Sequence, residues 1–108
     1  MSDDVVLTPY GKRYRVVEPL RYRELTVPAG YVTDLASIPR VLWPIVGSPY
    51  DPRFAKAATV HDYLYSTKQV PREEADKELK TLLRLAGVPR WKCQAMYLAV
   101  RAFGGLHW

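Results

Sequence analysis

Residues 71–87 read PREEADKELKTLLRLAG and have the pattern of an amphipathic helix. The segment opens with a proline, and Glu73 and Glu74 follow in the first turn, where carboxylates suit the positive end of the helix dipole. Gly87 closes the pattern, as glycine does at many helix ends. The apolar residues recur every three or four positions, which is the period of one helix face. The predicted buried stripe consists of Ala75, Leu79, Leu82, Leu83 and Ala86.

Prolines and glycines predict further helices on both sides of this segment. Asp51 is a capping residue, and Pro52 stands at the first helical position of a helix that extends to about residue 65. Residues 89–104 begin with proline and end with glycine, which is typical of a last helix. Residues 37–43 predict a short helix capped by the serine at its start.

The chain before residue 34 has the composition of strands. Short runs rich in Val, Tyr, Thr and Leu are interrupted by Pro and Gly. We predict strands over residues 14–18 and 20–25 and an edge strand over residues 5–8. Residues 26–32 are typical of a strand, a turn and a further short strand. Together these strands form a small antiparallel sheet.

The predicted fold class is therefore α+β within a single domain, residues 1–108. The sheet occupies about residues 5–33. A helical layer of three main helices and one short helix follows over about residues 37–104 and packs on one face of the sheet.

The composition excludes several classes of protein. A chain of 108 residues with 48% hydrophobic and 25% charged residues is typical of a globular domain. A single cysteine, Cys93, excludes an intramolecular disulfide, and we expect it to pack in the core. Two histidines are too few for a three-histidine metal centre. No apolar run approaches the roughly 20 residues that span a bilayer. The acidic N-terminus lacks a secretory signal, so we expect folding in a reducing cytoplasm.

His61 is the first candidate for a catalytic or metal-binding residue. On the helical period it shares the apolar face of its helix with Phe54, Ala58 and Tyr65. An inward-facing histidine is either an acid–base or metal position, or a core residue whose ring nitrogens bond to backbone or to a tyrosine hydroxyl. The periodicity alone leaves both interpretations open.

Asp76 is the predicted partner of His61. The connection over residues 66–70 is short, so the two helices are expected to pack antiparallel. That packing places Asp76 and His61 at similar heights, and a carboxylate there would accept the imidazole N–H and fix its tautomer. The other ring nitrogen could then take a proton from water. The alternative is a buried polar latch that joins the two helices.

Two further acids are candidate ligands. Asp62 follows His61 directly and stands in a candidate metal position. Asp34 lies where the sheet gives way to the helices, where it caps a turn through its side chain or acts as a ligand of a metal or of a histidine.

Basic residues gather on the last two helices, and the net charge of +5 suits an anionic partner. Trp91 is one of three tryptophans that suit a wet interface beside them. A solvated basic face is the default interpretation, and nucleic-acid binding is the alternative. The basic residues are Lys77, Lys80, Arg84, Arg90, Lys92 and Arg101.

Four segments together resemble a small family of phage and prophage proteins of unknown function. They are PAGYVTDLASIPR over residues 28–40, HDYLY over residues 61–65, EAD over residues 74–76 and VRAFG over residues 100–104. The resemblance covers about residues 8–108. It implies a bacteriophage or prophage origin and synthesis in the host cytoplasm, and it admits incorporation in the virion as a tail or neck component.

A local resemblance concerns the two central helices. His61, Asp62 and Tyr65, followed on the partner helix by Asp76, are similar to the active-site helices of secreted phospholipases A2. The resemblance implies that His61 is the base, that Asp76 orients it with support from Tyr65, and that Asp62 binds calcium. The chain lacks that family's cysteines around this helix and its glycine-rich calcium loop.

The sequence supports three hypotheses for the function. The first is an accessory hydrolase in which a His61–Asp76 dyad, with calcium at Asp62, acts on a lipid or another ester at the host envelope. The second is a non-catalytic virion or assembly protein, in contact with other virion proteins, in which the dyad is a structural latch. The third is a protein that binds an anionic polymer such as nucleic acid.

Overall fold

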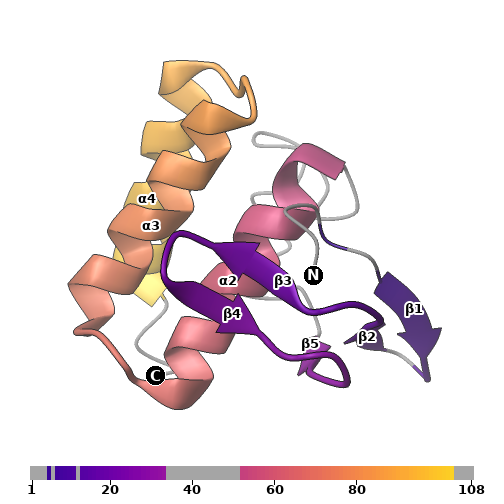
Figure 1. Cartoon of the computed structure of the whole chain (residues 1–108). Helices are drawn as coiled ribbons and strands as arrows, with labels where there is room; N and C mark the ends of the chain where they lie inside the picture. Colours follow the sequence, from indigo (N-terminus) through magenta and orange to yellow (C-terminus); the bar gives the residue numbers. More distant parts are fainter. Residues whose placement is uncertain (1–4, 6, 12, 34–51, 104–108) are drawn as a thin grey trace.

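The computed structural model describes residues 5, 7–11, 13–33 and 52–103, and Figure 1 shows a β-rich N-terminal part beside three helices. The strands are β1 (Leu7–Tyr10), β2 (Arg13–Val16), β3 (Leu20–Tyr22), β4 (Leu25–Val27) and β5 (Val32–Thr33), and the helices are α2 (Pro52–Thr67), α3 (Arg72–Leu85) and α4 (Arg90–Phe103). This order of strands before helices confirms the α+β class. The predicted short helix over residues 37–43 lies outside the described part of the chain.

The strands pair in two antiparallel sheets. One sheet has the order β1-β2-β5, and the other is the hairpin of β3 and β4. Leu7 pairs with Val16 across β1 and β2, and Tyr14 pairs with Thr33 across β2 and β5. β1 is therefore an edge strand, as predicted, although it spans Leu7–Tyr10 rather than residues 5–8.

Residues 20–25 form a hairpin, so the prediction of one strand over this segment is wrong. Tyr22 pairs with Leu25, and the chain reverses over Arg23 and Glu24. Arg23 has a φ of 53°, a conformation that non-glycine residues adopt infrequently. The turn residues Arg23 and Glu24 lack the Asn-Gly or Asp-Gly pair that is typical of a hairpin turn.

Helix α3 begins after Pro71 and ends at the predicted glycine. Gly87 has a φ of 88°, and its N–H donates to the carbonyl of Arg84, while Val88 N–H donates to the carbonyl of Leu83. These bonds satisfy carbonyls that the helix end leaves free. Ala86 lies at this end and is exposed, so it does not belong to the buried stripe; Ala75, Leu79, Leu82 and Leu83 do.

The core lies where the helices meet the β3–β4 hairpin, which covers α2 in the view of Figure 1. Helix α3 packs against both α2 and α4. Leu20 and Val27 of the hairpin join Phe54 of α2 in this core, and Cys93 of α4 is a buried free cysteine, as predicted. No helix in the described ranges is both long and apolar enough to cross a membrane.

Candidate active site

Asp76 of α3 is the centre of a buried polar cluster. Its side chain is 0% exposed, as is that of His61 on α2. His61 Nε2 lies 2.7 Å from Asp76 Oδ1, and the Tyr65 hydroxyl donates to the same oxygen over 2.5 Å. The structure therefore brings together three of the residues singled out from the sequence, and the predicted contact between His61 and Asp76 is confirmed.

The hydrogen bond determines which nitrogen of His61 carries the proton in the neutral ring. The Asp76 carboxylate can only accept, so Nε2 is the donor and Nδ1 has the lone pair. Nδ1 is buried and has no hydrogen-bond partner among the residues that the structure describes. The His61 ring also lies against the ring of Tyr65, with 4.3 Å between centroids. Among the described residues, the imidazole is thus held through Nε2, while Nδ1 has no partner.

Two arginines complete the cluster around Asp76, and sequence reasoning did not place them in the site. Arg101 Nη1 of α4 donates to Asp76 Oδ2 over 2.9 Å, and Arg72 Nε lies 4.0 Å from the same oxygen. Arg72 also donates to the Tyr65 hydroxyl over 3.3 Å and, through Nη2, to the Val100 carbonyl over 3.0 Å. Arg72 and Asp76 are four residues apart on one helix, and this spacing could have predicted their contact from the sequence. The sequence signal for Arg101 was its place in the VRAFG segment, which the other basic residues of α4 do not share.

These partners determine the charge of the site. Burial alone would raise the pKa of the Asp76 carboxyl, but hydrogen bonds from His61, Tyr65 and Arg101 outweigh it and hold that pKa below its ordinary value. Burial raises the pKa of Tyr65 to about 12, and its hydrogen bond to Asp76 adds to the rise. At neutral pH the site therefore contains a carboxylate and a neutral tyrosine.

Asp62 points to a different set of partners. Its Oδ2 accepts a hydrogen bond from the Tyr31 hydroxyl over 3.1 Å, and that hydroxyl lies 3.0 Å from Ser66 Oγ. Within the described ranges no three His, Cys, Asp or Glu side chains lie close enough together to hold a metal ion. The role of Asp62 as a calcium ligand stays a prediction. Asp34 lies outside the described residues.

A groove of about 580 Å³ opens between the β3–β4 hairpin and the connection from α2 to α3. Neither His61 nor Asp76 lines it. The Tyr22 hydroxyl at its edge donates to Glu78 over 2.5 Å, and burial, with that bond, raises the pKa of Tyr22 to about 12. The groove is lined by Tyr22, Arg23, Glu24, Leu25, Leu64, Gln69, Val70 and Glu78.

A family model described as "Protein of unknown function (DUF1353)" matches residues 12–100, which include most of the cluster around Asp76. The chain belongs to the DUF1353 family. Two proteins of Sinorhizobium fredii are similar to this DUF1353 chain. The uncharacterized protein y4jT is 40% identical over 78 residues, which are 72% of this chain and 23% of the relative. The uncharacterized protein y4iH is 33% identical over 72 residues, which are 67% of this chain and 30% of the relative.

The chain thus spans between about a quarter and a third of the length of these relatives. No solved structure is significantly similar to it. Membership of a family of unknown function, expected from the sequence, is confirmed. The phage origin and the resemblance to phospholipases A2 stay predictions.

Proposed function

We propose that this DUF1353 chain is a hydrolase in which His61 is the general base and Asp76 orients it. One observation carries the proposal: the buried imidazole has Nε2 bound to a carboxylate and Nδ1 without a partner in the part of the chain described. A buried polar atom left unpaired costs about 1–3 kcal/mol, and such atoms in native proteins call for an explanation. One explanation is that the lone pair of Nδ1 accepts a proton from water during the reaction.

The reaction class that suits this arrangement is hydrolysis of an ester. Nδ1 of His61 takes a proton from water while the water oxygen bonds to the ester carbonyl carbon. The imidazolium then returns the proton to the leaving alkoxide as the acyl–oxygen bond breaks. The Asp76 carboxylate stabilises the imidazolium, and Tyr65 and Arg101 keep that carboxylate in position. Asp76, Tyr65 and Arg101 are therefore positioning residues.

The local resemblance to secreted phospholipases A2 supports a lipid ester at the host envelope as the substrate class. Calcium enters only through that resemblance, so no step above depends on it. The resemblance to phage and prophage proteins supports an accessory role during infection.

A specific observation favours a second candidate, a non-catalytic virion or assembly protein. Asp76 of α3 contacts His61 and Tyr65 of α2 and Arg101 of α4, so a single carboxylate connects all three described helices. A latch of this kind holds the helical layer together whether or not Nδ1 has a use.

The substitution His61→Gln separates the two candidates. Glutamine offers an amide N–H to Asp76 but no base, so the latch is largely kept while proton transfer is lost. We expect wild type to hydrolyse a member of a panel of p-nitrophenyl and fluorogenic phospholipid esters. We expect His61→Gln to be at least about 100-fold slower, the usual lower limit of general-base catalysis, with a melting temperature within a few degrees of wild type.

Lys56→Gln, on the same helix and outside the cluster, is the matched control and should keep the full rate. Equal rates for wild type and His61→Gln would contradict the role of His61 as base. A wild type inactive on the whole ester panel would contradict ester hydrolysis and favour the latch.

A further inference from the structure

The charges of the chain are divided unequally along its length. All eleven Asp and Glu residues lie within residues 1–78, where eleven Lys and Arg residues balance them. Residues 79–108 contain five Lys and Arg residues and no acid, so they carry the whole formal charge of +5. Such asymmetry is typical of chains that bind an anionic polymer or surface. The five residues are Lys80, Arg84, Arg90, Lys92 and Arg101.

Three of these cations meet at one hollow between α3 and α4. The hollow has a volume of about 230 Å³ and is lined by Lys80, Arg84, Arg90 and Gln94, without a carboxylate. Lys80 Nζ donates to Gln94 Oε1 over 2.7 Å, so Gln94 accepts a hydrogen bond from one cation of the hollow. The hollow is therefore lined by ammonium and guanidinium donors, the groups that bind phosphate oxygens.

The charges at this hollow differ from those at the other end of the same helices. There, Lys77 pairs with Glu73 over 3.1 Å and Arg101 pairs with Asp76 over 2.9 Å. Within the described residues, neither Arg84 nor Arg90 has a carboxylate within ion-pair distance. Like charges that converge without a counter-charge repel one another, and a bound anion would relieve that repulsion.

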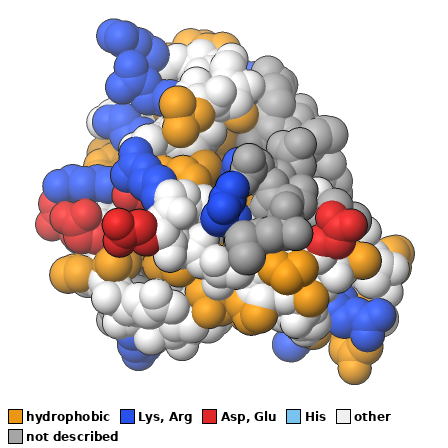
Figure 2. All heavy atoms as spheres, viewed as in Figure 1, with side chains coloured by type: hydrophobic (Ala, Val, Ile, Leu, Met, Phe, Trp, Pro, Cys, Tyr) orange, Lys and Arg blue, Asp and Glu red, His pale blue; other side chains and the backbone are white. Residues whose placement is uncertain are grey.

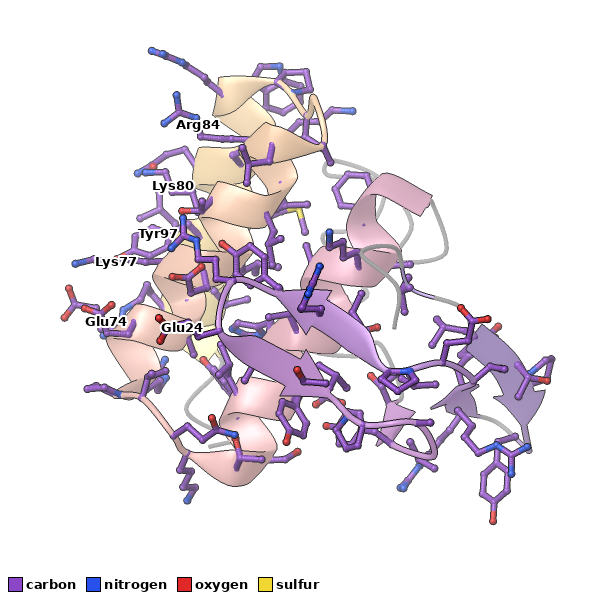
Figure 3. All side chains as sticks on the ribbon, in the orientation of Figure 1. Glu24, Glu74, Lys77, Lys80, Arg84 and Tyr97 are labelled. Atoms are coloured by element: carbon purple, nitrogen blue, oxygen red, sulfur yellow. The ribbon has the colours of Figure 1, made fainter. Side chains whose placement is uncertain are left out.

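The pictures show how the basic residues are arranged. Figure 3 shows Lys77, Lys80 and Arg84 following one another along the outer side of α3, with Tyr97 beside Lys80. Lys80 Nζ lies 5.2 Å from the centre of the Tyr97 ring. In Figure 2 several Lys and Arg side chains lie at the upper left, over α3 and α4, with a group of Asp and Glu side chains below them, and further Lys and Arg side chains lie in the centre, at the bottom and at the lower right.

An exposed aromatic ring lies at the start of α4, the same end of that helix as Arg90. Trp91 follows Arg90 at the start of α4 and is 59% exposed, and Lys92 Nζ lies 5.6 Å from its ring centre. A basic groove beside an exposed aromatic ring is the usual arrangement for single-stranded nucleic acid, where cations contact the backbone and the ring stacks on a base. A recessed set of donors fits the separate phosphodiester groups of a flexible strand better than the broad surface of a membrane.

We propose that the hollow between α3 and α4 binds the phosphate backbone of a single-stranded nucleic acid, with Trp91 stacking on a base. Lys80, Arg84 and Arg90 contact phosphates in this site. The site is separate from the His61–Asp76 cluster, and the proposal does not depend on hydrolase activity.

Fluorescence anisotropy of a labelled 20-nucleotide DNA strand with the full chain tests the proposal. Three neutralised phosphates give a slope of log affinity against log salt of about −2, so affinity should fall roughly 20-fold between 50 and 200 mM salt. The double variant Arg84→Gln with Arg90→Gln leaves one contact, and the same change in salt should then reduce affinity only about threefold. Trp91→Ala should weaken binding about fivefold or more without changing the slope.

The matched control is Arg13→Gln with Arg15→Gln, which removes the same charge from exposed positions of β2. This control should keep most of the affinity and the full salt slope. An equal loss in the control would show that net charge alone drives binding and would overturn the site. Absence of binding at 50 mM salt would also overturn it, as would binding to vesicles of phosphatidylglycerol and phosphatidylcholine without binding to DNA.

Discussion

Replacing Asp76 by asparagine keeps the size of the side chain but removes its charge and one acceptor oxygen. The remaining oxygen can still accept from His61 and Tyr65. The new amide N–H₂ group then faces Arg101, which is only a donor, so the 2.9 Å bond to Arg101 is lost and two donors oppose each other. We expect Asp76→Asn to fold with clearly reduced stability.

The size of the loss follows from these contacts. A hydrogen bond to a charged group contributes about 1.5–3 kcal/mol, and removal of one member of a buried ion pair costs about 3–5 kcal/mol. The Arg101 side chain is 34% exposed, which lowers the second figure. A loss of about 2–4 kcal/mol is therefore expected at pH 7, which corresponds to roughly 10–20 °C in melting temperature for a domain of this size.

The pH dependence provides a second signature. Because the folded state lowers the pKa of Asp76, its stabilising contribution is present above the unfolded pKa of about 3.9 and is lost as pH falls through the folded value. The difference in the free energy of unfolding between wild type and Asp76→Asn should therefore narrow as the pH falls below about 4.

Urea unfolding followed by circular dichroism at pH 3 to 8 measures both effects. Glu74→Gln removes an exposed carboxylate from the same helix and should change stability by less than about 0.5 kcal/mol. A difference of that size or smaller for Asp76→Asn at pH 7 would refute the reasoning, because the carboxylate would then not hold the helices together.

Three further substitutions test other parts of the structure. Tyr65→Phe should lose about 1 kcal/mol at pH 7 in urea unfolding. The folded state raises the pKa of Tyr65 to about 12 and so favours the protonated hydroxyl, which means that wild type loses stability as the pH rises from 10 toward 12. Tyr65→Phe should not show this loss. Gly87→Ala should lower stability by about 1–2 kcal/mol in thermal unfolding, because Gly87 has a φ of 88°, which strains an alanine. An unchanged stability would contradict the need for glycine at this helix end. If Asp62 is a calcium ligand, as predicted, millimolar calcium should raise the melting temperature saturably relative to EDTA, and Asp62→Asn should abolish the rise; an unchanged melting temperature would contradict calcium binding.

Much of the fold follows from local signals in the sequence. The helices begin and end close to the predicted prolines and glycines because these residues limit the backbone itself, whatever packs around them. The turn at Arg23 and Glu24 has no such signal: an arginine adopts a positive φ there only because pairing of Tyr22 with Leu25 compensates for it. The position of this turn therefore depends on strand pairing and could not be predicted from the turn residues themselves.

The candidate site shows the same division between local and long-range information. The pair of His61 and Asp76 could be predicted because each lies near the inner face of its helix, and a short connection brings the two helices together in one register. Arg101 reaches Asp76 from a third helix, and its contact depends on how α4 packs against α3, which helical periodicity does not specify. A buried carboxylate without cations would be costly, so the presence of Asp76 on an apolar stripe already implied a partner beyond a neutral histidine. That unmet charge indicated that Asp76 needs a cationic partner: Arg72 could be inferred from its spacing on the same helix, but the contact with Arg101 follows only from the packing of α4 against α3.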